Sequence, residues 1–152
     1  TQGPSFGPLG SFGANAAEGH HKPDNTVLKP GDCVLFDVGC RVNDYCSDMT
    51  RTFFYQSVTE KQREVYEVVK RANLAAQAAM KPGMRFCDID KVARDIITEA
   101  GYGPNFTHRL GHCIGIEVHD LLLRARHLPS GRVRRENRGF DADHQRWSHE
   151  LK

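Results

Sequence analysis

The spacing of apolar residues changes from strand-like to helical part-way along the chain. Residues 33–39 form a short apolar run rich in β-branched and aromatic side chains, and a Lys-Pro-Gly-Asp turn signal precedes it, so a buried strand is predicted there. A shorter strand is predicted around residues 10–12. Asn43 and Asp44 are typical of a hairpin turn, which predicts that residues 47–55 return as an antiparallel strand.

Two helices are predicted after these strands. Thr59 can act as an N-cap, and helical spacing continues to Met80, where a Lys-Pro-Gly sequence ends the helix. Asp88 is expected to cap a second helix that Gly101 closes, and residues 108–119 predict a strand and a tight loop. This order of elements indicates an α+β domain with an antiparallel sheet and packed helices. The apolar faces comprise Val65, Val68, Ala72, Ala75, Ala76 and Ala79, then Ile89, Val92, Ala93, Ile96 and Ile97.

Length and composition indicate one globular domain. The chain has 152 residues, a mass of 17.1 kDa and 39% hydrophobic residues, and no stretch approaches the roughly 18 apolar residues that a membrane span needs. Residues 1–13 lack the basic start and apolar run of a secretory signal, so no such signal is predicted there. The chain does not begin with Met, so we expect a fragment or a trimmed chain. Five cysteines without Cys-x-x-Cys spacing favour free thiols in a reducing cytoplasm.

Charge divides the chain near Asp120. Residues 1–120 carry 13 Lys and Arg against 15 Asp and Glu, whereas residues 121–152 carry 8 against 4 and hold seven of the fourteen arginines. We therefore predict a domain over residues 1–120 and an atypical Arg-rich tail over residues 121–152. A nucleic-acid-binding arm is disfavoured, because Phe140 and Trp147 are the only aromatic side chains among these arginines.

Asp37 and Asp48 are the first candidates for chemistry. Asp37 interrupts the apolar run, where an ionised carboxylate is costly to bury unless a cation or hydrogen-bond donors neutralise it. Asp48 lies on the returning arm of the hairpin, so both carboxylates can face one point, and Thr50 and Thr52 share the face of Asp48. A single buried Asp is usually a turn or cap partner, but two close carboxylates repel each other, which favours a metal site.

Histidines among glycines in residues 108–120 strengthen the metal hypothesis. His112 follows Gly111 and therefore has room for the close approach of a metal or a backbone. One histidine alone is more often a surface or core residue, but imidazole together with carboxylates suits Mn, Co, Fe or Zn better than Mg or Ca. His20 and His21 add two candidate donors, for which an exposed loop is the alternative interpretation.

Five segments between about residue 12 and Asp120 resemble the pita-bread metallopeptidases, the family of the methionine aminopeptidases and the Xaa-Pro peptidases. The stretches Ser-Asp-Met-Thr-Arg-Thr-Phe and His-Arg-Leu-Gly-His-Cys-Ile-Gly-Ile-Glu-Val-His-Asp are most similar to the Xaa-Pro branch. The resemblance implies a partial pita-bread fold, with a partial metallopeptidase catalytic domain over residues 1–120. The five segments are residues 13–17, His20 and His21, residues 37–39, residues 45–53 and residues 108–120.

The resemblance also implies a centre with two divalent metal ions, which the family holds through two Asp, one His and two Glu. Asp37, Asp48 and His112 match three of these ligands, and manganese is the expected metal, with Co, Zn or Fe as alternatives. His20 and His119 match histidines that contact the substrate and stabilise the tetrahedral intermediate. The implied reaction is removal of an N-terminal residue, before proline, from a peptide substrate; the intact enzyme is expected to be a cytoplasmic homodimer without nucleic-acid or membrane partners.

The two Glu ligands are not found where the family has them. Residues 121–152 contain no Glu-Pro-Gly segment, and Glu136 is the candidate for the last ligand, although an exposed Arg-rich segment is the simpler interpretation. We therefore expect impaired activity, and a non-catalytic, peptidase-like protein-binding module is the alternative function.

One hypothesis for the loss of the Glu-Pro-Gly segment is a shifted reading frame over part of the tail. For one choice of codons, Glu-Pro-Gly-Ile-Tyr-Leu read one base early becomes the Arg-Ala-Arg-His-Leu-Pro found at residues 124–129. Genuine divergence of the tail is the alternative.

Overall fold

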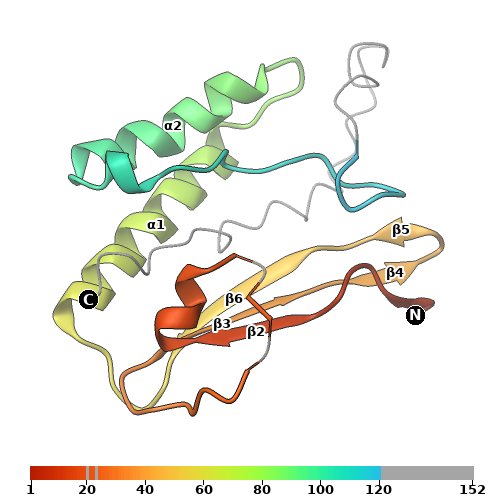
Figure 1. The fold of residues 1–152 in the computed structure, drawn as a ribbon. Helices are drawn as coiled ribbons and strands as arrows, with labels where there is room; N and C mark the ends of the chain where they lie inside the picture. The colour runs from red at the N-terminus through yellow and green to blue at the C-terminus, as the bar shows by residue number, and fades with distance from the viewer. Residues whose placement is uncertain (20, 23, 121–152) are drawn as a thin grey trace.

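The structure, a computed structural model, describes residues 1–120 except residues 20 and 23. Strands occupy the first part of the chain and two long helices follow them (Figure 1). The predicted tail, residues 121–152, lies outside the described residues. In chain order the elements are β1 Gly3–Pro4, β2 Leu9–Phe12, the 3₁₀ helix η1 Gly13–Ala17, β3 Cys33–Val38, β4 Cys40–Val42, β5 Tyr45–Cys46, β6 Met49–Phe54, α1 Glu60–Ala79, α2 Phe86–Glu99 and the 3₁₀ helix η2 Gly103–Asn105.

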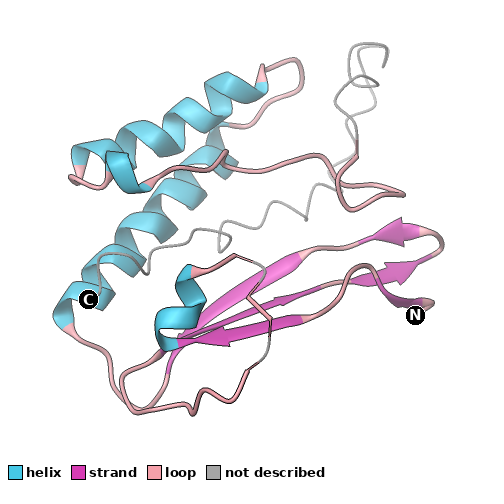
Figure 2. Cartoon of the chain, viewed as in Figure 1, coloured by secondary structure: helices cyan, strands magenta, loops and turns pink. Residues whose placement is uncertain are grey.

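The strands form two antiparallel sheets, ordered β2-β3-β6 and β1-β4-β5 (Figure 2). The strands predicted at residues 10–12 and 33–39 are confirmed as β2 and β3. Asn43 and Asp44 have φ of 49° and 67°, as the central residues of a two-residue type I′ turn require, so the predicted hairpin turn is also confirmed. The predicted returning strand, residues 47–55, is confirmed as β6, which pairs antiparallel with β3. The short strand β5 precedes it and pairs with β4 in the other sheet.

The two sheets separate where Gly39 and Ser47 approach each other closely. The Ser47 amide donates to the Cys40 carbonyl at 2.9 Å, and the Ser47 hydroxyl accepts from the Cys40 amide at 3.0 Å. A side chain at Gly39 would collide with the Ser47 carbonyl and the Ser5 hydroxyl, so only glycine fits there. This junction holds the chain immediately before Asp48.

The two faces of the β3–β6 pair differ around Asp37. On the inner face Asp37 lies opposite Thr50, and both side chains are buried. On the outer face the rings of Phe36 and Phe53 are about half exposed and meet edge to face, with centroids 6.2 Å apart. Met49 is exposed as well. Soluble sheets usually bury apolar side chains, so the burial of Asp37 and Thr50 indicates that this part of the inner face has a role besides packing.

Helix α1 forms as its sequence predicts. Thr59 and Gln62 make a capping box, in which each side chain bonds the backbone amide of the other residue. The helix ends at Ala79, with Met80 as its C-cap.

The predicted cap of the second helix is wrong. Helix α2 begins at Phe86, so Asp88 lies inside its first turn rather than at the cap. Asp88 instead accepts two hydrogen bonds from the Arg85 guanidinium, at 2.8 and 2.9 Å, and its negative charge favours a helix N-terminus from this position as well. The predicted end is confirmed, because Gly101 follows the helix with φ of 89°.

The hydrophobic core lies between the two helices and the segment that follows α2, rather than against the sheet. The Tyr102 hydroxyl donates to Glu64 at 2.8 Å, which ties the end of α2 to α1. The buried apolar residues of this core are Val65, Val68, Val69, Ala72, Ala76, Ile89, Ala93, Ile97, Tyr102, Phe106 and Leu110.

The strand predicted within residues 108–119 is not formed. This segment runs beside α2 and then turns towards the β4–β5 hairpin (Figure 1). Its backbone bonds are isolated and partly internal, since the Gly115 amide donates to the Glu117 carbonyl and the Asp120 amide donates to the Cys113 carbonyl. A strand needs a continuous ladder, which such bonds do not build.

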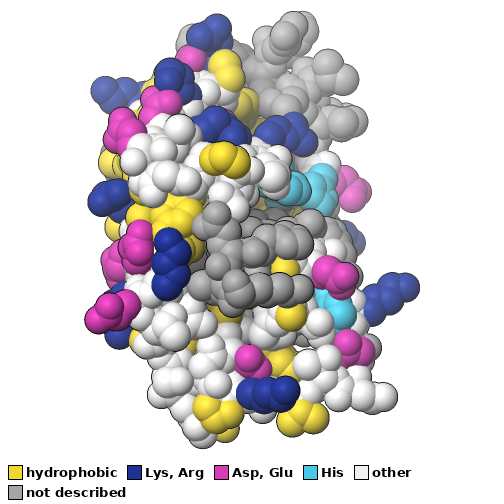
Figure 3. Space-filling model, turned by 60° about the vertical axis from the view of Figure 1, so that its left-hand side comes forward, with side chains coloured by type: hydrophobic (Ala, Val, Ile, Leu, Met, Phe, Trp, Pro, Cys, Tyr) yellow, Lys and Arg dark blue, Asp and Glu magenta, His cyan; other side chains and the backbone are white. Residues whose placement is uncertain are grey.

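Within the described part of the chain, no helix is long and apolar enough to span a membrane. Acidic and basic side chains are mixed among the coloured residues on the face drawn in Figure 3.

The core predicts that Ile97→Ala is strongly destabilising. Ile97 is fully buried on α2, and removing its side chain leaves a cavity, so we expect a loss of about 2–5 kcal/mol in the free energy of unfolding. Urea denaturation followed by circular dichroism measures this loss. The matched control is Leu74→Ala on α1, where the side chain is 56% exposed and the expected change is within about 0.5 kcal/mol. Equal effects of the two substitutions would contradict the assigned core.

Candidate metal centre

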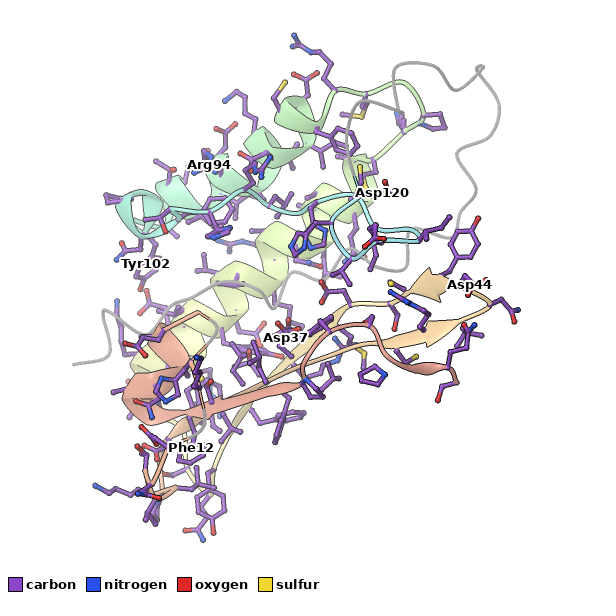
Figure 4. All side chains as sticks on the ribbon, turned by 45° about the vertical axis from the view of Figure 1, so that its right-hand side comes forward. Phe12, Asp37, Asp44, Arg94, Tyr102 and Asp120 are labelled. Atoms are coloured by element: carbon purple, nitrogen blue, oxygen red, sulfur yellow. The ribbon has the colours of Figure 1, made fainter. Side chains whose placement is uncertain are left out.

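The two predicted aspartate ligands lie on the inner face of the sheet. Asp37, near the end of β3, is 6% exposed and accepts a hydrogen bond from the Thr50 hydroxyl at 3.2 Å. Asp48 directly precedes β6 and is 9% exposed, and strand alternation puts it on the same side as Thr50. Figure 4 shows Asp37 between the strands and the helices. Two carboxylates buried on one face create a need for positive charge.

His112 supplies an imidazole at this place. Its Nε2 atom lies 3.4 Å from Oδ2 of Asp48, and its Nδ1 atom lies 3.0 Å from the Cys113 carbonyl oxygen. The Asp48 carboxylate raises the pKa of His112 above its ordinary value of 6.5, because it stabilises the protonated ring, while partial burial acts in the opposite direction. When Nδ1–H donates to the Cys113 carbonyl, the lone pair of Nε2 is directed towards Asp48.

His119 lies beside His112. The centroids of the two rings are 4.4 Å apart and their planes are tilted by 35°. The structure therefore brings together two of the three histidines predicted for the site. The third, His20, and the candidate ligand Glu136 lie outside the described residues.

His21, the additional donor considered from the sequence, is engaged in a cluster of its own loop. Its Nδ1 atom lies 2.6 Å from Oε2 of Glu18, and its Nε2 atom lies 3.4 Å from Oδ2 of Asp24. The hydrogen bond to Glu18 raises the pKa of His21 above 6.5. Both ring nitrogens thus face carboxylates, which favours an ion-pair role over metal ligation.

Cys46 on β5 joins the segment of His112 and His119 to the sheet. The Cys46 amide donates to the Gly115 carbonyl at 2.7 Å, and its thiol donates to the Ile116 carbonyl at 3.2 Å. Sequence reasoning missed this contact, because both acceptors are backbone atoms that carry no residue-specific signal. Its place two residues before Asp48 in the chain is the one hint that the sequence offers.

The donor set fits a divalent metal, although the described residues contain no cluster of three or more His, Cys, Asp and Glu arranged to hold one. Asp48 and His112 are paired, and Asp37 is buried on the same face. Buried carboxylates beside an imidazole with a directed lone pair are the ligands that Mn, Fe, Co and Zn accept. The fit rests on this burial and pairing.

Comparison with known proteins points the same way. The chain is 49% identical over 117 residues to an Xaa-Pro dipeptidase of Lactobacillus delbrueckii subsp. lactis, which covers 77% of this chain and 32% of the relative. A prolidase from Pyrococcus furiosus matches with a TM-score of 0.74 and 43% identity, covering 77% of this chain and 35% of that one. An Xaa-Pro dipeptidase from Bacillus anthracis matches with a TM-score of 0.74 and 36% identity, covering 78% and 33%.

The chain spans about a third of the length of these relatives. The model of metallopeptidase family M24 matches residues 1–140, which includes twenty residues beyond the domain boundary predicted at residue 120. The strands and helices of this chain that match these structures form part of the pita-bread fold that the sequence resemblance implied. The chain therefore belongs to metallopeptidase family M24.

Proposed function

We propose that this chain carries metal ligands of a peptidase that removes an N-terminal residue before proline. The observation that carries the proposal is the His112–Asp48 pair, 3.4 Å apart, on the sheet face that also buries Asp37. Membership of family M24 supports metallopeptidase chemistry, and the names of the relatives support the Xaa-Pro specificity. Because residues 121–152 lack the family's Glu-Pro-Gly segment, the activity of this chain is expected to be impaired.

The roles proposed for the described side chains follow from their positions, and the role proposed for His20 follows from the family resemblance alone. Asp37, Asp48 and His112 would hold divalent metal ions, with manganese preferred and Co, Zn or Fe as alternatives. Such ions polarise the scissile carbonyl and lower the pKa of the attacking water. His119, beside His112, would donate a hydrogen bond to the oxygen on which charge develops, and His20 would contact the substrate.

The proposal also includes the cellular compartment and the partners of the protein. All five cysteines are free thiols, which supports a reducing cytoplasm. The proposed partners are peptides and, for the intact protein, a second copy of the chain. The division into a domain over residues 1–120 and an Arg-rich tail over residues 121–152 stays a prediction.

Asp48→Asn tests the site directly. We expect this change to abolish Mn²⁺-dependent release of proline from Ala-Pro and to weaken Mn²⁺ binding by more than the roughly 10–100-fold typical of an outer-shell partner. Calorimetric titration of the full chain with Mn²⁺ and a proline assay measure the two effects. Asp44→Asn, at the tip of the β4–β5 hairpin (Figure 4), is the matched control and should change neither. Unchanged Mn²⁺ binding by Asp48→Asn would refute the ligand assignment.

Mn²⁺ affinity is expected to rise with pH. The metal must displace the proton of His112, whose pKa the Asp48 carboxylate raises above 6.5, so binding should still be strengthening as the pH passes 6.5. Titrations with Mn²⁺ between about pH 5.5 and about pH 8.5 measure this profile. An affinity that is flat over this range would show that His112 does not release a proton to the metal.

Glu136→Gln decides whether the tail contributes a ligand. If Glu136 replaces the last family ligand, its loss should weaken Mn²⁺ binding at least about tenfold in the same titration. Glu150→Gln, in the same tail, is the control. Equal affinities of the two variants would exclude Glu136 from the metal centre.

A further inference from the structure

A pair of charged residues on α2 binds the backbone that leads to His112. The Arg94 guanidinium donates to the Phe106 carbonyl at 2.8 Å and to the His108 carbonyl at 3.0 Å. One turn earlier on the helix, Oδ1 of Asp90 accepts a hydrogen bond from the Leu110 amide at 2.8 Å. The segment thus lies along α2 through three side-chain to backbone bonds, as its course in Figure 1 shows.

The pair is itself held in place. The Nε atom of Arg94 donates to Oδ2 of Asp90 at 2.8 Å, so each side chain orients the other. The Arg94 guanidinium also lies 4.3 Å from the centre of the Phe106 ring. Phe106 and Leu110 are both buried in the core, so the backbone between them is fixed from both sides.

A second ion pair on α2 has the same i,i+4 spacing but, within the described residues, makes no bond to the segment that leads to His112. Lys91 donates to Asp95 at 2.7 and 2.8 Å, and both side chains are more than half exposed. Its geometry is that of an ordinary surface i,i+4 pair, which contributes little to stability. The difference between the two pairs is that Asp90 and Arg94 use their remaining hydrogen-bonding atoms on the segment of His112.

We propose that Asp90 and Arg94 are positioning residues of the metal centre, which place His112 against Asp48 by fixing residues 106–110. This inference rests on the proposed function, because it takes His112 as a metal ligand. His112 lies two residues beyond Leu110, and Cys46 anchors the same segment on its far side. Metal affinity therefore depends on two residues that contact neither the metal nor the substrate.

The test compares Arg94→Ala, Arg94→Lys and Asp90→Asn with the controls Lys91→Ala and Asp95→Asn, all in the full chain. Hydrogen–deuterium exchange of peptides covering residues 106–112 reports whether the segment is held, and titration with Mn²⁺ reports the metal centre. We expect Arg94→Ala and Asp90→Asn to speed this exchange and to weaken Mn²⁺ binding about 10–100-fold. Arg94→Lys keeps the charge but not the two-pronged bond, so it should fall between Arg94→Ala and the unaltered chain. The controls should change neither measurement.

A second measurement, in a chain that already carries His112→Gln, separates an effect on the position of His112 from an effect on overall stability. In a His112→Gln chain, Arg94→Ala should cause no further loss of Mn²⁺ affinity, because the ligand that it positions is gone. The same loss with and without His112, or no loss at all, would overturn the inference. The proposed function fails separately, if Asp48→Asn binds Mn²⁺ as well as the unaltered chain does. Asp90→Asn keeps the size of the side chain and loses the charge that orients Arg94, so this variant gives an answer even if Arg94→Ala does not fold.

Discussion

The burial of Asp37 and Asp48 on one face of the sheet is the constraint on which the rest of the structure depends. Ionised carboxylates cannot serve as a hydrophobic core, so the inner sheet face is polar around Asp37, Asp48 and Thr50. The apolar core forms elsewhere, between α1, α2 and the segment after α2. Phe36 and Phe53 meanwhile occupy the outer face, where they remain half exposed. An exposed aromatic surface of this kind favours association with other polypeptide.

The three candidate ligands are held in place in different ways. Asp37 belongs to a paired central strand, and Asp48 follows a junction that Gly39 and Ser47 fix by close approach. His112 has no strand of its own to hold it. Its segment depends on α2 at one end and on Cys46 at the other, which makes the helix layer part of the site's geometry. A site that needs backbone contacts from outside itself is sensitive to changes far from its ligands.

Local signals predicted most of the regular structure. The N-cap at Thr59, the hairpin turn at Asn43 and Asp44, and the end of α2 before Gly101 depend on neighbouring residues alone, and all were predicted correctly. The start of α2 was wrong because Asp88 has two stabilising positions, as a cap or within the first turn, and the adjacent Arg85 favours the second. The strand expected within residues 108–119 failed because alternation cannot reveal whether a neighbouring strand is available for pairing.

The sequence by itself determined the kinds of metal-binding side chain, the elements that carry Asp37 and Asp48, and the likeness to the pita-bread peptidases. Tertiary structure decided that His112 meets Asp48, that His21 bonds its own loop, and that Arg94 and Cys46 support the centre. The physical reason is the nature of the partners. Arg94 and Cys46 bond carbonyl groups 12 to 70 residues away, and every residue has such a group, so only the folded chain selects which ones are used.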